Sequence, residues 1–242
     1  KSRVVKREMP PWFLDKTIGI QKYKGDPSLK DSEIATLVKW VDTGATEGNP
    51  ADLPQAPAQQ DVSTWTIGTP DLVVKYPTFK MPATGPDLYG TLDAPFGTTE
   101  DRYIKAIQSR VVDVNSRKVI HHALSYAVEP NEDGDMGDDA GGGSGLFLVE
   151  YASGKNATFY PADTGLVLPA GRNARVSYHF HSIGEEVDAK LELGVVFYPK
   201  GFVPKHVQWS KQLGQEAATE FDIPANSIVR RDGYQRMNVA AR

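Results

Sequence analysis

Five runs of β-branched and aromatic residues in the second part of the chain constrain its fold most. Glycine and proline separate these runs, and no long helical repeat lies between them. The runs are DLVVKYP (71–77), RKVIHHALSYAV (117–128), GLFLVEYA (145–152), ARVSYHFHS (174–182) and AKLELGVVFYP (189–199). Successive strands without crossover helices favour antiparallel pairing. The pattern therefore predicts a mainly β fold, an antiparallel jelly-roll-like sandwich, over residues 64–205.

The first fifty residues predict a short α-helical segment instead. Apolar residues recur there at three- and four-residue spacing, which gives a helix one apolar stripe. The stripe consists of Ile34, Leu37, Val38 and Val41. Asp31 or Ser28 can cap the start of this helix, and Gly44 can end it. We therefore expect a helical segment over residues 1–48, a proline- and alanine-rich linker over 49–63, and a following segment or second domain over 206–242.

Composition narrows the possible functions. The 242 residues carry a net charge of −4, which gives no reason to expect a nucleic-acid partner. No apolar run approaches the ~20 residues that span a bilayer. The absence of cysteine excludes disulfides, thiolate metal sites and covalent haem attachment within these residues. The acidic, glycine-rich stretch 129–145 does not have the spacing of an EF-hand and is expected to be a solvated loop.

Four of the five histidines lie in two of the strand runs. In the run 174–181, alternation places Ala174, Val176, Tyr178 and Phe180 on one face, towards the core. His179 and His181 share the opposite, polar face, with their rings ~7 Å apart along the strand. Two imidazoles at this distance can bind one metal ion.

The adjacent pair His121 and His122 behaves differently. Neighbouring residues in a regular strand point to opposite faces, so a bulge or a strand end is needed before both can approach one ion. All-nitrogen ligation suits copper, zinc, iron or nickel, and the residues alone leave the choice between copper and zinc open. Independent hydrogen bonding of each histidine is the alternative. His206 stands apart from the others and is expected to be a surface or packing residue.

The histidine runs belong to a longer pattern that resembles a known family. PDLVVKYPTFKMPATGPDLYGTL, TEDRYIKAIQSRVVDVNSRKVIHHALSYAV and LPAGRNARVSYHFHSIGEEVDAKLELGVVF follow one another in residues 64–200. Together they resemble the N-terminal domain of the copper type II, ascorbate-dependent monooxygenases, which include the peptidylglycine α-hydroxylating and dopamine β-type enzymes. The resemblance implies that His121 and His122 match the pair that binds the electron-transferring copper.

The same resemblance assigns His179 to the later histidine–aromatic motif, although Phe180 stands where the family has tyrosine. His181 departs from the family pattern and is a candidate fourth ligand or a neighbouring group. The candidate metal ligands are thus His121, His122, His179 and His181. The family's oxygen-activating copper lies in a second β domain, for which these residues show no counterpart.

Residues 1–48 resemble the C-terminal part of a c-type cytochrome domain. EMPPW is followed by LKDSEIATLVKWVDTGATEGNPADLP, and the methionine of the MPPW motif is the sixth ligand of haem iron in that class. The resemblance implies that Met9 binds haem c, with the attachment motif not in this chain. A thioether ligand raises the haem potential, which suits electron transfer.

These resemblances imply one half of a copper-dependent monooxygenase fused to a haem c domain, in a multidomain periplasmic or otherwise extracytoplasmic oxidoreductase. Its expected partners are an upstream haem c segment and a downstream second β domain or other subunits. The alternative is a non-catalytic scaffold or accessory subunit with a structural or absent metal. A hydrolytic zinc site is a weaker alternative, because no carboxylate is placed to serve as its base.

Overall fold

The computed structural model describes residues 1–11, 17, 19, 23, 26–55, 64–130, 145–152, 154–155, 157–208 and 223–229. The chain forms two compact units, Lys1–Gln59 and Gln60–Arg242, and the division falls within the predicted linker 49–63. Most of the predicted acidic loop 129–145 and of the predicted segment 206–242 lies outside the described residues. Within the described part of the chain, every helix is too short or too polar to cross a membrane.

The described residues of the first unit contain three short helical elements. They are α1 (Ser2–Val5), α2 (Asp31–Asp42) and the 3-10 helix η1 (Pro50–Asp52). Neither Asp31 nor Ser28 caps α2, because the helix begins one residue after Lys30 and the Glu33 carboxylate accepts the Lys30 backbone N–H at 2.7 Å. A carboxylate three residues into a helix can satisfy this donor. Gly44 follows the helix with a φ of 96°, as predicted for the glycine that ends it.

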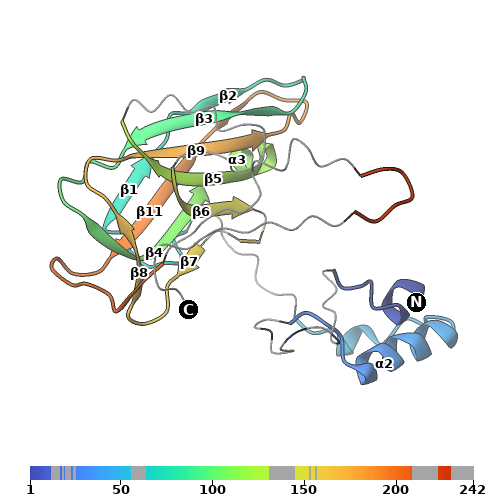
Figure 1. Cartoon of the computed structure of the whole chain (residues 1–242). Coiled ribbons are helices and arrows are strands. Elements are labelled where there is room, and N and C mark those ends of the chain that lie inside the picture. Colours follow the sequence, from blue (N-terminus) through green and yellow to red (C-terminus); the bar gives the residue numbers. More distant parts are fainter. Residues whose placement is uncertain are drawn as a thin grey trace. The chain divides into compact units, whose positions relative to one another are not determined.

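The second unit is a mainly β sandwich, which confirms the predicted fold class (Figure 1). One sheet has the order β1 (Leu72–Lys75), β11 (Leu191–Phe197), β4 (Arg102–Val111), β8 (Thr164–Leu168) and β12 (His206–Val207), and β7 (Ala157–Phe159) also pairs with β4. The other has the order β3 (Leu88–Pro95), β9 (Asn173–Phe180), β5 (Ile120–Val128) and β6 (Leu146–Ala152). A short pair joins β2 (Phe79–Met81) to β10 (Val187–Ala189). All pairings are antiparallel within the described residues except that of β12 with β8.

The core contains apolar side chains from both sheets. Ile104, Ile107, Leu193 and Val195 contribute from the first sheet, and Ala123, Val176 and Phe180 from the second. On β9 the core residues are Ala174, Val176, Tyr178 and Phe180, which confirms the predicted apolar face of this strand. The side chains of the alternate β9 residues therefore lie on the opposite face of the second sheet.

The predicted strand 117–128 begins three residues late, because residues 114–119 form the short helix α3 (Val114–Val119). Asp113 caps this helix and accepts the Ser116 backbone N–H at 2.8 Å. Ser116 is fully buried, and its hydroxyl accepts the Lys190 backbone N–H at 3.0 Å. These bonds anchor α3 to the chain beside β10, so that β5 starts at Ile120, immediately before the histidine pair.

Candidate metal centre

A β-bulge in β5 brings His121 and His122 to the same face of the second sheet. Ile120 pairs with Phe180 and His122 pairs with His179, so two steps along β5 correspond to one step along β9. The extra residue is His121. Ile120 and Ala123 both lie in the core, whereas strict alternation would put them on opposite faces. The bulge is the distortion that the adjacent pair requires.

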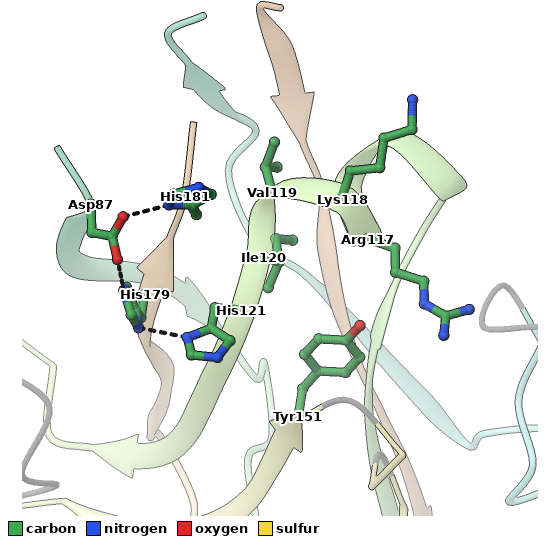
Figure 2. A pocket seen from close by; sticks show the side chains of 9 residues that line it. All are labelled: Asp87, Arg117, Lys118, Val119, Ile120, His121, Tyr151, His179 and His181. Carbon is green, nitrogen blue, oxygen red and sulfur yellow. Dashed lines mark hydrogen bonds and ion pairs between the residues drawn. The ribbon is translucent and has the colours of Figure 1, made fainter. Parts of the chain in front are cut away.

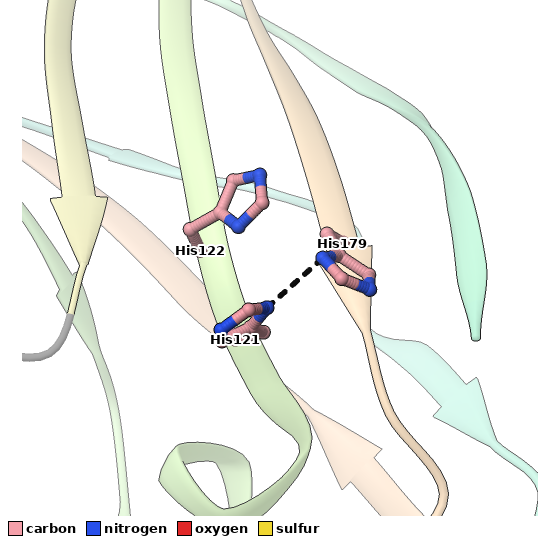
Figure 3. A group of neighbouring side chains, drawn as sticks. All are labelled: His121, His122 and His179. Atoms are coloured by element: carbon pink, nitrogen blue, oxygen red, sulfur yellow. Dashed lines mark hydrogen bonds between the residues drawn. The ribbon is translucent and has the colours of Figure 1, made fainter. Parts of the chain in front are cut away.

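The bulge brings three imidazoles together at the junction of β5 and β9 (Figure 3). The possible ligand nitrogens of His121, His122 and His179 all lie within 4.8 Å of one another. The Nδ1 atoms of His121 and His179 are 3.0 Å apart, and the three ring centroids are separated by 4.7–5.2 Å. Two nitrogens bound to one ion at ~2.0 Å lie about 3.3 Å apart in tetrahedral geometry. The arrangement is therefore compatible with one bound ion.

Asp87 fixes which nitrogen of His179 faces the cluster. This carboxylate lies just before β3, and its Oδ2 atom is 2.6 Å from Nε2 of His179. An ionised carboxylate only accepts, so His179 donates its Nε2 hydrogen and keeps the Nδ1 lone pair. That lone pair points towards His121. The hydrogen bond leaves Nδ1 available as a metal ligand atom.

The second oxygen of Asp87 binds His181. Its Oδ1 atom is 2.6 Å from Nδ1 of His181, so one carboxylate connects two histidines of β9 and its C-terminal extension. The hydrogen bond from His181, followed by that from His179, lowers the pKa of the Asp87 carboxyl. The carboxylate is therefore ionised throughout the neutral range and remains an acceptor for both rings.

Packing holds His179 in place from a further side. Tyr89 lies opposite His179 in the β3–β9 pairing, and the two rings stack at 4.3 Å with planes 17° apart. His179 is only 7% exposed, whereas His122 is half-buried and His121 is exposed. The cluster therefore has one imidazole that neighbours hold firmly and one that faces outwards.

A pocket of about 440 Å³ lies beside the cluster (Figure 2). Its walls are formed by Asp87, Arg117, Lys118, Val119, Ile120, His121, Tyr151, His179 and His181. The volume is within the usual range of small-molecule sites. Burial raises the pKa of the Tyr151 hydroxyl, and nearby Arg117 partly offsets this effect. The hydroxyl accordingly keeps its hydrogen at neutral pH.

The predicted site residues have different outcomes. His121, His122 and His179 come together, whereas His181 lies outside this three-histidine cluster and binds Asp87. His206 is exposed on β12, as expected for a surface residue. Met9 lies in the first unit, 46% exposed. Asp87 and Tyr89 were not predicted, and their link to His179 depends on the β3–β9 register, which carries no local sequence signal.

Comparison with known proteins finds no family model and no curated protein that matches this chain. The geometry of the site therefore carries the functional argument, together with the sequence resemblance.

Proposed function

We propose that this chain binds one copper ion through His121, His122 and His179. We further propose that it is the electron-transferring part of a copper-dependent monooxygenase. The observation that carries the proposal is the three-histidine cluster, assembled by a bulge on one face of a sheet. A copper ion bound there would supply one-electron chemistry between Cu(I) and Cu(II).

The donor set fits such an ion. Three neutral imidazoles bind both oxidation states of copper, and no carboxylate belongs to the cluster within the described residues. The resemblance to the monooxygenase N-terminal domain supports copper over zinc, because the same three histidines match that family's motif. His181 would then act on the site through Asp87, with its own Nδ1 engaged by the carboxylate.

Metal analysis tests the proposal directly. The purified 242-residue chain, loaded with Cu(II) and desalted, is expected to retain one copper per chain and to show the electron paramagnetic resonance signal of nitrogen-ligated Cu(II). His122→Ala should lose most of this copper. His206→Ala is the matched control, because it removes the exposed histidine of β12 and should leave copper binding unchanged.

The alternative outcomes are distinct. Equal loss of copper in His122→Ala and His206→Ala would show that binding is not at the cluster. Tight retention of zinc in place of copper, with no redox cycling, would favour the accessory role with a structural metal. His181→Ala tests the fourth ligand: an unchanged number of bound nitrogens in the Cu(II) signal is expected if His181 acts through Asp87, and the loss of one nitrogen if His181 is a ligand.

We also propose that Met9 is an axial ligand of haem c, so that residues 1–48 belong to an electron-transfer unit. The support is the MPPW motif and the helix α2 that follows it. The holoprotein purified from its native source should show c-type absorption bands. Met9→Ala should lower the haem reduction potential, because the thioether favours the reduced state. An unchanged potential would exclude this ligand.

A further inference from the structure

The pocket beside the histidine cluster has a wall that the proposed metal site does not use. This wall is formed by Arg117 and Lys118 of α3 and by Tyr151 of β6 (Figure 2). Arg117 is exposed, and its guanidinium has no ion-pair or hydrogen-bond partner among the residues that the structure describes. Lys118, in contrast, is paired with Glu185 at 3.2 Å.

Tyr151 provides a second donor on the same wall. Tyr151 is 4% exposed, and its hydroxyl has no hydrogen-bond partner within the described part of the chain. In Figure 2 the hydroxyl points to the side of the pocket on which Arg117 lies. An unpaired guanidinium beside a phenolic O–H matches the two oxygens of a carboxylate, which accept both kinds of hydrogen.

The remaining surfaces of the pocket favour an organic molecule. Val119 and Ile120, which are 0% and 4% exposed, form its apolar floor between Arg117 and His121, and Tyr151 adds an aromatic residue. Asp87, the acidic residue that lines the pocket, is already bonded to two histidines, and Glu185 outside the pocket is bonded to Lys118. Among the described residues that line the pocket, Arg117 is therefore the positively charged side chain that no acidic group neutralises, and an entering anion can pair with it.

We propose that this pocket binds a small organic carboxylate, held by Arg117 and the Tyr151 hydroxyl with its apolar part against Val119 and Ile120. The bound molecule would lie next to His121, the exposed member of the cluster. The site uses no metal ligand as an anchor, so it does not depend on the proposed copper. If copper is bound, the molecule would lie beside the centre, on the side lined by His121 and His179.

The test uses the metal-free 242-residue chain and a pair of probes of equal shape. Benzoate, added to the isotopically labelled protein, should shift the backbone amide signals of residues 117–121 and 151 saturably. Benzamide, which lacks the charge, should bind at least about tenfold more weakly, since hydrogen bonds to charged groups are the stronger ones. Inorganic phosphate should not compete effectively, because it makes no use of the apolar wall.

Two variants identify the anchors. Arg117→Gln should weaken benzoate binding about tenfold, and Tyr151→Phe should weaken it less, because it removes one neutral donor. Lys105→Gln is the control: it removes one exposed positive charge from β4, in the other sheet, and should have no effect. Neither pocket variant should alter the copper content of loaded protein, which separates this site from the proposed metal centre.

Three results would overturn the inference. One is the absence of saturable shifts at these amides up to high millimolar benzoate. Another is equal binding of benzamide or of phosphate. The third is an equal effect of Lys105→Gln and Arg117→Gln, which would show non-specific attraction. If the protein binds benzoate but does not bind copper, the proposed function is wrong and the proposed carboxylate site is still supported.

Discussion

Asp87 contributes one oxygen to each of two histidines, and this geometry gives it a specific role at the residue scale. Through Nε2 it orients the His179 ring and reserves Nδ1 for the cluster. The carboxylate is itself partly exposed, but both rings donate to it at 2.6 Å. Groups that orient metal-binding histidines in this way commonly change metal affinity by about ten- to a hundredfold.

We therefore expect Asp87→Asn to weaken copper binding by about ten- to a hundredfold, because an amide cannot accept from both rings as an ionised carboxylate does. Competition with a chelating indicator would measure the affinity. Asp93→Asn is the matched control. Asp93 lies on β3, the strand that follows Asp87, and binds Arg175 at 2.6 and 2.7 Å, away from the cluster. It should lower stability and leave copper affinity intact; equal losses in the two variants would argue against a specific role for Asp87.

A second residue-scale prediction concerns Gly194 in β11. A Cβ atom there would lie 2.6 Å from the ring of Trp65, which also stacks on the Arg110 guanidinium at 3.9 Å. Gly194→Ala should therefore destabilise the protein by about 1–3 kcal/mol through overpacking. Urea unfolding would measure the change in the free energy of unfolding. In a Trp65→Ala background the same substitution should cost much less, and an undiminished cost would show that the ring is not its cause.

Residue patterns allowed part of the site to be predicted. Alternation correctly separates the core face of β9 from the face that carries His179, because the side-chain period of a strand is two. Alternation alone favoured His179 with His181 as a ligand pair. The resemblance to the monooxygenase family pointed instead to His121, His122 and His179, which are the three that the fold clusters. Asp87 escaped prediction because its partners lie more than 90 residues away.

At the scale of elements, the histidine cluster depends on the bulge in β5, whereas the packing of the core does not. Deleting His121 would make the pairing of β5 with β9 regular, with Ile120 still opposite Phe180 and His122 still opposite His179. Every other residue of the strand keeps its face. We expect this deletion to preserve the fold, with a small change in melting temperature, and to abolish tight copper binding. Calorimetry and metal analysis would measure the two effects.

Deleting Ala123 provides the contrast. The strand is regular at this point, so the deletion either turns the residues on one side of it to the opposite face or places His122 opposite Tyr178, in the core position of Ala123. That variant should lose the cooperative unfolding transition. Similar behaviour of the two deletions, either both folded or both unfolded, would contradict the assignment of His121 as the extra residue of the bulge.

The strands differ in how well they can be predicted from the sequence. β6, β9 and β11 are rich in β-branched and aromatic residues and were predicted near their observed bounds. β3 and β4 were not, because LYGTLDAP contains glycine and proline, and RYIKAIQSRV carries charged and amide side chains. Gln108 of β4 is fully buried, yet its amide is satisfied by Thr64 and Thr66, a pairing that becomes visible only in three dimensions.

At the scale of the whole molecule, the candidate site belongs entirely to the second unit. The three clustered histidines, Asp87 and Tyr89 all lie within Gln60–Arg242. A fragment of residues 60–242 should therefore bind copper with the stoichiometry and affinity of the full chain. Metal analysis of the two proteins side by side would test this. Weaker binding by the folded fragment would show that residues 1–59 contribute to the centre.

The bulge at His121 also indicates how a three-histidine cluster can be gained or lost during evolution. One additional codon distinguishes an ordinary antiparallel strand from one that presents neighbouring imidazoles on the same side. The hydrophobic interior is the same in both cases, so selection for folding places no demand on that codon. A sandwich of this kind can thus gain or lose the three-histidine cluster while its interior stays the same.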